Sequence, residues 1–181
     1  MSDFFNAFEM SPVPAPGPDA VAPDPFRGIY AMPMFVTVPT RDLEASTDFW
    51  VQGLGFIELF SVPGQVVHLR RWVFQDVLLV PATADTATTS VSGMQVSFSG
   101  VLGQLDPVAA ACRALRPGSV TGPRDTPWNT RDVEVITPEG VRVVLTAAKL
   151  FDPESAEAKY WASVGVVAPD TAGGEDNGIH G

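Results

Sequence analysis

Residues 41–56 read RDLEASTDFWVQGLGF, and this stretch decides how the rest of the chain is interpreted. Asp42 is suited to cap a helix that begins at Leu43, because its carboxylate can accept the backbone N–H groups left unpaired in the first turn. Apolar side chains then recur at helical spacing, and glycines follow closely, as is typical where helices end. The stretch therefore predicts a helix from Leu43 to Leu54.

Strand-like segments lie on both sides of this predicted helix. Residues 34–39 precede it, and residues 56–62, 66–72 and 77–80 follow it with a Pro-Gly turn between the first two. Apolar, β-branched and aromatic residues bounded by turn residues are typical of strands. The first half of the chain thus predicts the order strand, helix and three strands.

The same order recurs in the second half. A strand over 94–99 leads to Asp106-Pro107, which predicts an N-cap and a first helical residue for a helix ending at Leu115. Strands are expected around Val120 and over 131–136 and 141–147. We therefore predict an α+β fold of two βαβββ modules, residues 32–82 and 93–148, whose sheets can curl around a common cleft.

Two flanking segments differ from this domain in composition. Residues 1–31 form a Pro-rich arm, with six prolines between residues 11 and 25, and its Phe26–Tyr30 stretch can dock on the domain. The Phe4, Phe5 and Phe8 cluster leaves two alternatives open, a cover for the domain or a partner subunit, and a loose tail. Residues 149–181 predict a short helix over 153–163 and a flexible acidic tail.

Composition excludes several function classes. The net charge of -10 disfavours nucleic-acid binding, because an acidic surface repels phosphates. No apolar run is long enough to span a membrane, and the N-terminus lacks the pattern of a signal peptide. The single cysteine, Cys112, is expected to be a buried apolar residue, and together these features suggest a cytoplasmic protein. With only His68 and His180 present, a His-based metal site or a Cys-His triad is not expected.

The opening stretch resembles the first module of the vicinal-oxygen-chelate superfamily, which includes glyoxalases, bleomycin-resistance proteins and dioxygenases. The resemblance lies in Arg41-Asp-Leu43, the aromatic pair Phe49-Trp50, and Leu54-Gly-Phe56. Pro127-Trp128-Asn-Thr-Arg131 and Thr137-Pro-Glu-Gly140 resemble the ending of the second module, although Asn129 and Thr137 replace a usual Gly and Asp. Both modules match in order over residues 32–148. The resemblance implies the fold and, by analogy, a homodimer.

In metal-dependent members of that superfamily, His, Gln or Glu side chains on the first and last strands of each module hold a divalent cation. The matching positions in this chain are Phe35, Leu79, Met94 (with Gln95 beside it) and Val144. The second and third of these carry a register uncertainty of one or two residues. Because their side chains supply no suitable oxygen or nitrogen ligands, we expect no metal and no cofactor. The resemblance is then closest to the metal-free bleomycin-resistance-like proteins.

Other side chains are candidates for a ligand-binding face. Alternation places Thr37 beside Phe35, and it places His68, Arg70 and Trp72 on one face of their strand. In one interpretation Val67 and Leu69 pack against the helix while His68 and Arg70 face solvent. In the other, the face away from the helices lines the cleft, as it does in the fold that the resemblance implies. Gln75, expected to share a face with Val77 and Leu79, and Trp128, on a loop at the cleft rim, complete the predicted ligand-binding set.

These features lead to three functional hypotheses. The first is a metal-independent small-molecule binding protein that sequesters an antibiotic without transforming it. Whether the protein is an enzyme therefore depends on the choice between this hypothesis and the next two. The second is a metal-independent isomerase, cyclase or lyase of secondary metabolism, in which His68, Arg70 and Asp76 perform general acid–base chemistry. The plainer alternative for Asp76 is a turn aspartate paired with an arginine. The third is a glyoxalase- or dioxygenase-like metal enzyme whose ligands lie at other positions than the four named above.

Overall fold

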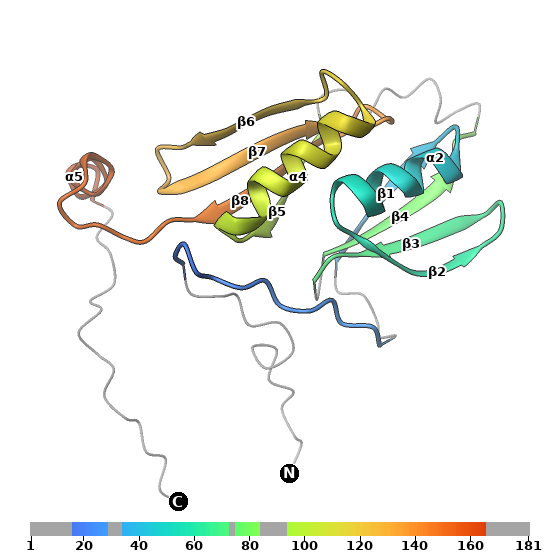
Figure 1. The fold of residues 1–181 in the computed structure, drawn as a ribbon, viewed down its shortest axis with the longest axis horizontal. Helices are drawn as coiled ribbons and strands as arrows, with labels where there is room; N and C mark the ends of the chain where they lie inside the picture. The colour runs from blue at the N-terminus through green and yellow to red at the C-terminus, as the bar shows by residue number, and fades with distance from the viewer. Residues whose placement is uncertain (1–15, 29–33, 73–74, 84–93, 166–181) are drawn as a thin grey trace, which may run out of the picture. The chain divides into compact units, whose positions relative to one another are not determined.

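A computed structural model describes residues 16–28, 34–72, 75–83 and 94–165. Contacts divide the chain into two compact units, residues 1–150 and residues 151–181. The first unit holds the arm and both predicted modules, whereas the described part of the second holds a short helix, α5 (Ala156–Ser163), capped by the Ser155 hydroxyl (Figure 1). Among the described residues, no helix has the length and apolar character needed to cross a membrane.

The first module consists of one mixed sheet with a broken helix between its first two strands. Its elements are β1 (Phe35–Thr40), α2 (Leu43–Asp48), η1 (Phe49–Gly53), β2 (Ile57–Val62), β3 (Val66–Arg70) and β4 (Asp76–Pro81). The strand order is β1-β4-β3-β2, with β1 parallel to β4 and the other pairs antiparallel. The helix runs into η1, a turn of π-helix, within the predicted Leu43–Leu54 span.

The second module repeats this topology. Its elements are β5 (Gln95–Gly100), α4 (Leu102–Leu115), β6 (Val120–Asp125), β7 (Thr130–Ile136) and β8 (Arg142–Ala148). The strand order is β5-β8-β7-β6, again with the first strand parallel to the last. The predicted α+β fold of two βαβββ modules is confirmed.

The two helices begin differently from one another. As predicted, the Asp42 carboxylate accepts the backbone N–H of Ala45 at 3.0 Å and caps α2. The prediction for α4 is wrong, because the helix begins at Leu102, so that Asp106 and Pro107 lie inside it. At the start of the helix, the Gln104 side chain accepts a hydrogen bond from the backbone N–H of Val101. This N–H group is therefore paired without a cap at Asp106.

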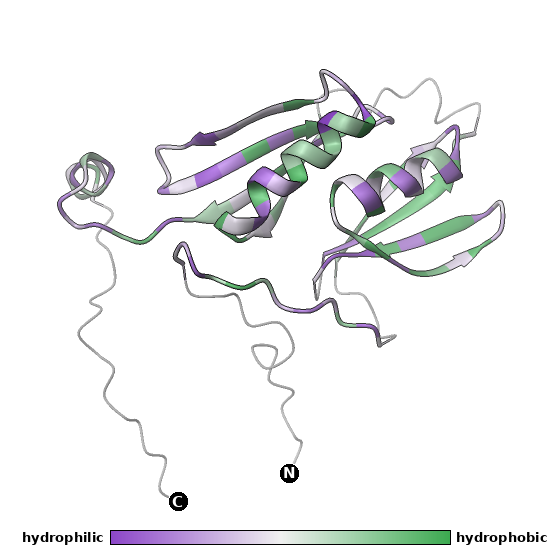
Figure 2. Cartoon of the chain, in the orientation of Figure 1, coloured by the Kyte–Doolittle hydropathy of each residue, from purple (hydrophilic) through white to green (hydrophobic). Residues whose placement is uncertain are grey.

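One face of each sheet is covered by the helix of its own module, and the core lies in that layer (Figure 1). Figure 2 shows apolar residues along the sides of α4 and in the central strands. The helical layers of the modules also meet each other, since a Cβ added at Gly53 in η1 would lie 3.0 Å from the Cys112 sulfur in α4. Phe56 and Phe98 extend this junction with an edge-to-face contact at 5.3 Å. The opposite face of each sheet is therefore not covered by the helix of its module.

Candidate functional site

Three side chains of the first sheet form a buried, charged cluster. Asp76 Oδ1 lies 2.6 Å from His68 Nε2 and accepts a hydrogen bond from Arg70 Nε at 2.7 Å. The side chains of Arg70 and Asp76 are fully buried and that of His68 is 4% exposed. The three residues proposed from the sequence as an acid–base group are thus brought together.

Strand register explains why these residues meet. Arg70 in β3 pairs directly with Asp76 in β4, and His68 lies two residues back along β3, on the same side of the sheet. The alternate residues Val67, Leu69 and Val77 belong to the apolar core under the helices. The cluster therefore lies on the face away from the helices, as the sequence predicts for His68 and Arg70.

The N-terminal arm covers this cluster. Arg70 Nη1 donates hydrogen bonds to the backbone carbonyls of Phe26 at 2.9 Å and of Gly28 at 2.8 Å. The Phe26 ring centroid lies 6.0 Å from the guanidinium carbon of Arg70. The predicted docking of the arm is thus found for Phe26 and Gly28, whereas residues 29 and 30 lie outside the described part of the chain.

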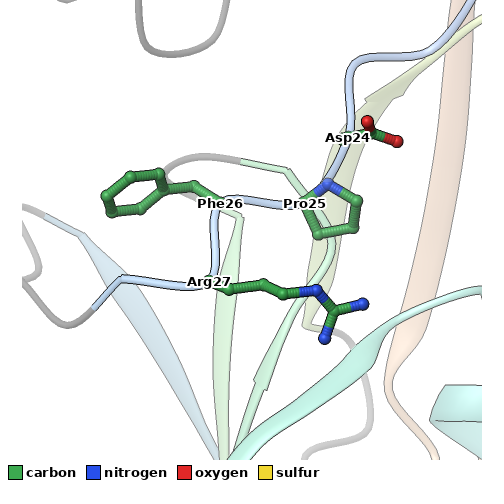
Figure 3. Close-up of a pocket in the computed structure, with 4 residues that line it drawn as sticks. All are labelled: Asp24, Pro25, Phe26 and Arg27. Atoms are coloured by element: carbon green, nitrogen blue, oxygen red, sulfur yellow. The ribbon is translucent and has the colours of Figure 1, made fainter.

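A cavity of about 630 Å³ opens beside the docked arm (Figure 3). Its described lining residues are consecutive in the chain: Asp24, Pro25, Phe26 and Arg27. The side chains of Phe26 and Arg27 point away from each other in this view. The arm therefore does not fill all of the space around it.

The second nitrogen of the His68 imidazole lacks a hydrogen-bond partner among the described residues. His68 Nδ1 is buried and makes no hydrogen bond with any described residue, while the Phe60 ring packs edge-on against the imidazole at 5.2 Å. Because the carboxylate of Asp76 can only accept, Nε2 carries a proton, and in the neutral imidazole Nδ1 then has an open lone pair. A buried polar atom without a partner costs about 1–3 kcal/mol, which a ligand donating a hydrogen bond would recover.

Several predicted ligand-binding residues lie on the face away from the helices. Phe35 is 46% exposed and Thr37 is exposed, while the intervening Val36 packs against the core. In the second module, Val144 alternates with the core residues Val143 and Leu145 and therefore also points to the open face of its sheet.

The predicted orientation of Leu79 is wrong. Leu79 is fully buried in the core cluster, with Val67 opposite it in the neighbouring strand. Leu78, which pairs with His68, occupies the other face of β4. The prediction missed because residues of both faces of this strand are apolar, so that hydrophobicity could not fix its register.

The remaining candidates lie at strand ends and loops. Trp72 and Gln75 lie outside the strands; Trp72 is 3% exposed, and Gln75 hydrogen-bonds to Arg71 through its backbone carbonyl. Met94 precedes β5 and is 37% exposed, and Trp128 is 65% exposed on the loop before β7.

Arg71 is a structural residue that the sequence did not single out. Its guanidinium crosses from the first module to the second, where Nη1 donates to the Ser99 carbonyl and Nη2 donates to the Gln104 side chain at 2.7 Å. Burial lowers the pKa of Arg71 to about 10. The sequence signal for a buried Arg71 was the pair of adjacent arginines at the end of an apolar strand. Alternation places Arg70 and Arg71 on opposite faces of the sheet, so one of the two must point toward the helices.

The residues present do not fit the divalent cation that the fold family implies. Phe35, Met94 and Val144 provide no hard or borderline donor atom. The ligand position in β4 falls on Leu78 or Leu79, and neither side chain can bind a cation. Within the described ranges, no three His, Cys, Asp or Glu side chains are grouped so that they could hold a metal ion. Burial raises the pKa of the Cys112 thiol to about 12, which makes it a poor nucleophile, in agreement with the predicted apolar role.

Comparisons with known proteins address the fold. No family model and no curated protein sequence matches the chain. A glyoxalase/bleomycin resistance protein/dioxygenase from Nocardioides superposes with a TM-score of 0.50 at 21% identity, over 71% of this chain and 89% of the other. The hypothetical protein SA1046 from S. aureus gives a TM-score of 0.53 at 15% identity, over 67% and 97%.

A third similar structure is TnmS3, described as an antibiotic binding protein from Streptomyces sp. CB03234. Its TM-score is 0.49 at 24% identity, over 64% of this chain and 93% of TnmS3. At these identities the likeness speaks for the fold and not for the ligand. With its two βαβββ modules in this order, the chain has the vicinal-oxygen-chelate fold, the fold of the glyoxalase/bleomycin resistance/dioxygenase proteins.

Proposed function

We propose that this protein is a metal-independent small-molecule binding protein that sequesters an antibiotic on the open face of its first sheet. The observation that carries the proposal is the chemistry of that face. Phe35 stands where a metal ligand would stand, and its partner in strand register, Asp76, belongs to the buried cluster with His68 and Arg70.

This combination suits binding better than metal-dependent catalysis. Ligand sites are mostly apolar, with a few fixed polar groups that orient the bound molecule. Here Phe35 and Phe60 offer partly exposed aromatic surface, and Arg70 and His68 offer polar groups held in place by Asp76. The net charge of -10 additionally favours neutral or cationic ligands over anions.

Calorimetric titration with planar, cationic and peptide-like antibiotics tests the proposal. We expect at least one compound to bind, and mass spectrometry to recover it unchanged after prolonged incubation. Phe35→Ala should weaken binding about tenfold, corresponding to the loss of about 1.4 kcal/mol of contact. Leu115→Ala is the matched control, because Leu115 is 45% exposed, close to the 46% of Phe35, but lies on α4. Recovery of a chemically altered compound would refute sequestration.

A second candidate function is a metal-independent isomerase, cyclase or lyase. It is favoured by one observation, the pairing of His68 Nε2 with Asp76 while Nδ1 is left without a partner. A carboxylate on one imidazole nitrogen orients the ring and leaves the other nitrogen able to take a proton. If turnover of a substrate is found, His68→Gln should reduce kcat at least a hundredfold, while the control Leu115→Ala on α4 should not. Unchanged turnover in His68→Gln would remove this candidate.

Two further measurements bear on the proposal. Metal analysis of the purified protein should find no stoichiometric zinc, nickel, manganese or iron, and a stoichiometric metal would revive the metal-enzyme alternative. We also propose a homodimer located in the cytoplasm. A monomer in native mass spectrometry at micromolar concentration would contradict the dimer.

A further inference from the structure

The arm segment Phe26–Gly28 contacts the candidate site as a ligand would. It offers two backbone carbonyls to one nitrogen, Arg70 Nη1. It also places an aromatic ring against the same guanidinium. A fully buried arginine that receives two carbonyls and a ring from a separate segment constitutes a formed recognition site.

The local conformation of the arm depends on Gly28. A Cβ added there would lie 2.5 Å from Phe26 Cζ and 2.7 Å from Phe26 Cε1, so the ring folds back directly over the glycine. Any larger residue at position 28 would push the ring aside. The close approach therefore allows the segment to present its ring and both carbonyls together.

The charge of the cluster determines whether a neutral or a charged oxygen is favoured as the hydrogen-bond acceptor for Arg70. Asp76 already pairs with Arg70 through Nε, so the positive charge is compensated within the cluster. An additional carboxylate would bring an excess negative charge into a buried site, which is costly. Neutral amide carbonyls, such as those of Phe26 and Gly28, avoid this cost.

We propose that Phe26–Gly28 is an internal ligand of the Arg70 site, and that the external ligand displaces it with a peptide-like group of the same form. That group carries two amide carbonyls for Arg70 Nη1 and an aromatic ring to replace Phe26. A hydrogen-bond donor on the ligand would pair with His68 Nδ1, which the arm leaves without a partner. This inference rests on the proposed binding function and adds to it the ligand class and a built-in competitor.

The test uses the full-length protein and the probe acetyl-Pro-Phe-Arg-Gly-amide, which copies residues 25–28. The tethered arm competes at an effective concentration on the order of millimolar, so the wild type should bind the probe weakly. Gly28→Val and Phe26→Ala should each lower the Kd of the probe at least tenfold. Val21→Ala is the control, because Val21 lies in the same segment but is 80% exposed. Equal Kd values in all four proteins, or no binding to either arm variant, would overturn the proposal.

A change in the probe tests the role of the carbonyl without altering the protein. An alkene isostere of the Phe-Arg bond removes the oxygen that represents the Phe26 carbonyl. It should bind Gly28→Val at least tenfold more weakly than the amide probe does, and equal binding would contradict the assigned contact.

The two proposals fail in different ways. An antibiotic that binds wild type and Gly28→Val equally well supports sequestration but refutes the internal ligand. A probe that binds as expected, with every recovered compound chemically altered, supports the internal ligand and refutes sequestration.

Discussion

The two modules share one topology, but the open faces of their sheets differ in burial. In the first, Arg70 and Asp76 are fully buried beneath the arm and joined at 2.7 Å. In the second, Glu134 pairs with Arg142 at 3.4 Å, and the arginine side chain is 51% exposed. Glu134 stands opposite Val144, as His68 stands opposite Leu78, so the register of the two sheets is similar.

The comparison shows that two modules with the same backbone topology can differ in how much their ion pairs contribute to stability. A buried ion pair is strongly coupled, because removing one partner leaves the other charged in a medium of low polarity. An exposed pair of the same charges is screened by water and contributes little. We therefore expect substitutions at related places in the two sheets to have very different consequences.

The largest effect is expected for Asp76→Asn. This change keeps the shape of the side chain but leaves the buried Arg70 cation without its carboxylate. We expect a loss of about 3–5 kcal/mol in the free energy of unfolding, measured by urea denaturation. A loss below 1 kcal/mol would show that the cluster is far more hydrated than its burial indicates.

The next effect tests the junction that couples the modules. Gly53→Val places methyl groups against Cys112 and Leu115, whose atoms would lie 3.0 Å and 3.3 Å from an added Cβ. Overpacking of this kind should cost about 1–3 kcal/mol of unfolding free energy. Gly103→Ala is the matched control, because nothing lies within 4 Å of its added Cβ, and it should be neutral or stabilising. Equal stability of the two variants would mean that η1 and α4 are not closely packed.

A smaller effect is expected from pH. The pKa of Cys112 is raised from 9.0 to about 12 by burial, so the unfolded chain loses this proton at lower pH than the folded chain does. The stabilisation is complete below pH 9 and falls as pH rises toward 12. At pH 10 the wild type should have lost about 1.4 kcal/mol more than Cys112→Ala, relative to pH 7. Parallel pH profiles of the two proteins in urea denaturation would contradict the assigned burial.

The smallest effect is expected for Glu134→Gln. This substitution removes the carboxylate that pairs with Arg142 on the second sheet, where the arginine is half exposed. The loss should stay below about 1 kcal/mol and should shrink further in high salt. A cost as large as that of Asp76→Asn would break the comparison between the faces, since burial would then not be what distinguishes them.

Much of the fold followed from local sequence signals. The cap at Asp42, the turn residues and the alternation of apolar side chains predict both βαβββ modules and nearly all strand positions. The prediction failed at Asp106, where a good local cap lost to an earlier start at Leu102. It also failed at Leu79, where apolar residues on both faces of β4 concealed the register.

The candidate site was less accessible to prediction. Alternation placed His68 and Arg70 on one face and suggested that Asp76 lies near them, because these residues are close in sequence. The contact with Phe26 and Gly28 joins residues more than forty positions apart, and no periodicity reports such a pairing. The crossing of Arg71 to Ser99 and Gln104 was missed for the same reason.

The sequence by itself determined the two modules, the apolar side chains at the metal positions and the shared face of His68 and Arg70. These features depend on residue identity and on the two-residue period of a strand, both of which are local. Only the tertiary structure decided that the cluster is buried, that His68 Nδ1 is left without a partner and that the arm supplies carbonyls to Arg70. Burial and long-range contacts depend on how separate segments pack, so they cannot be predicted from local patterns in a single sequence.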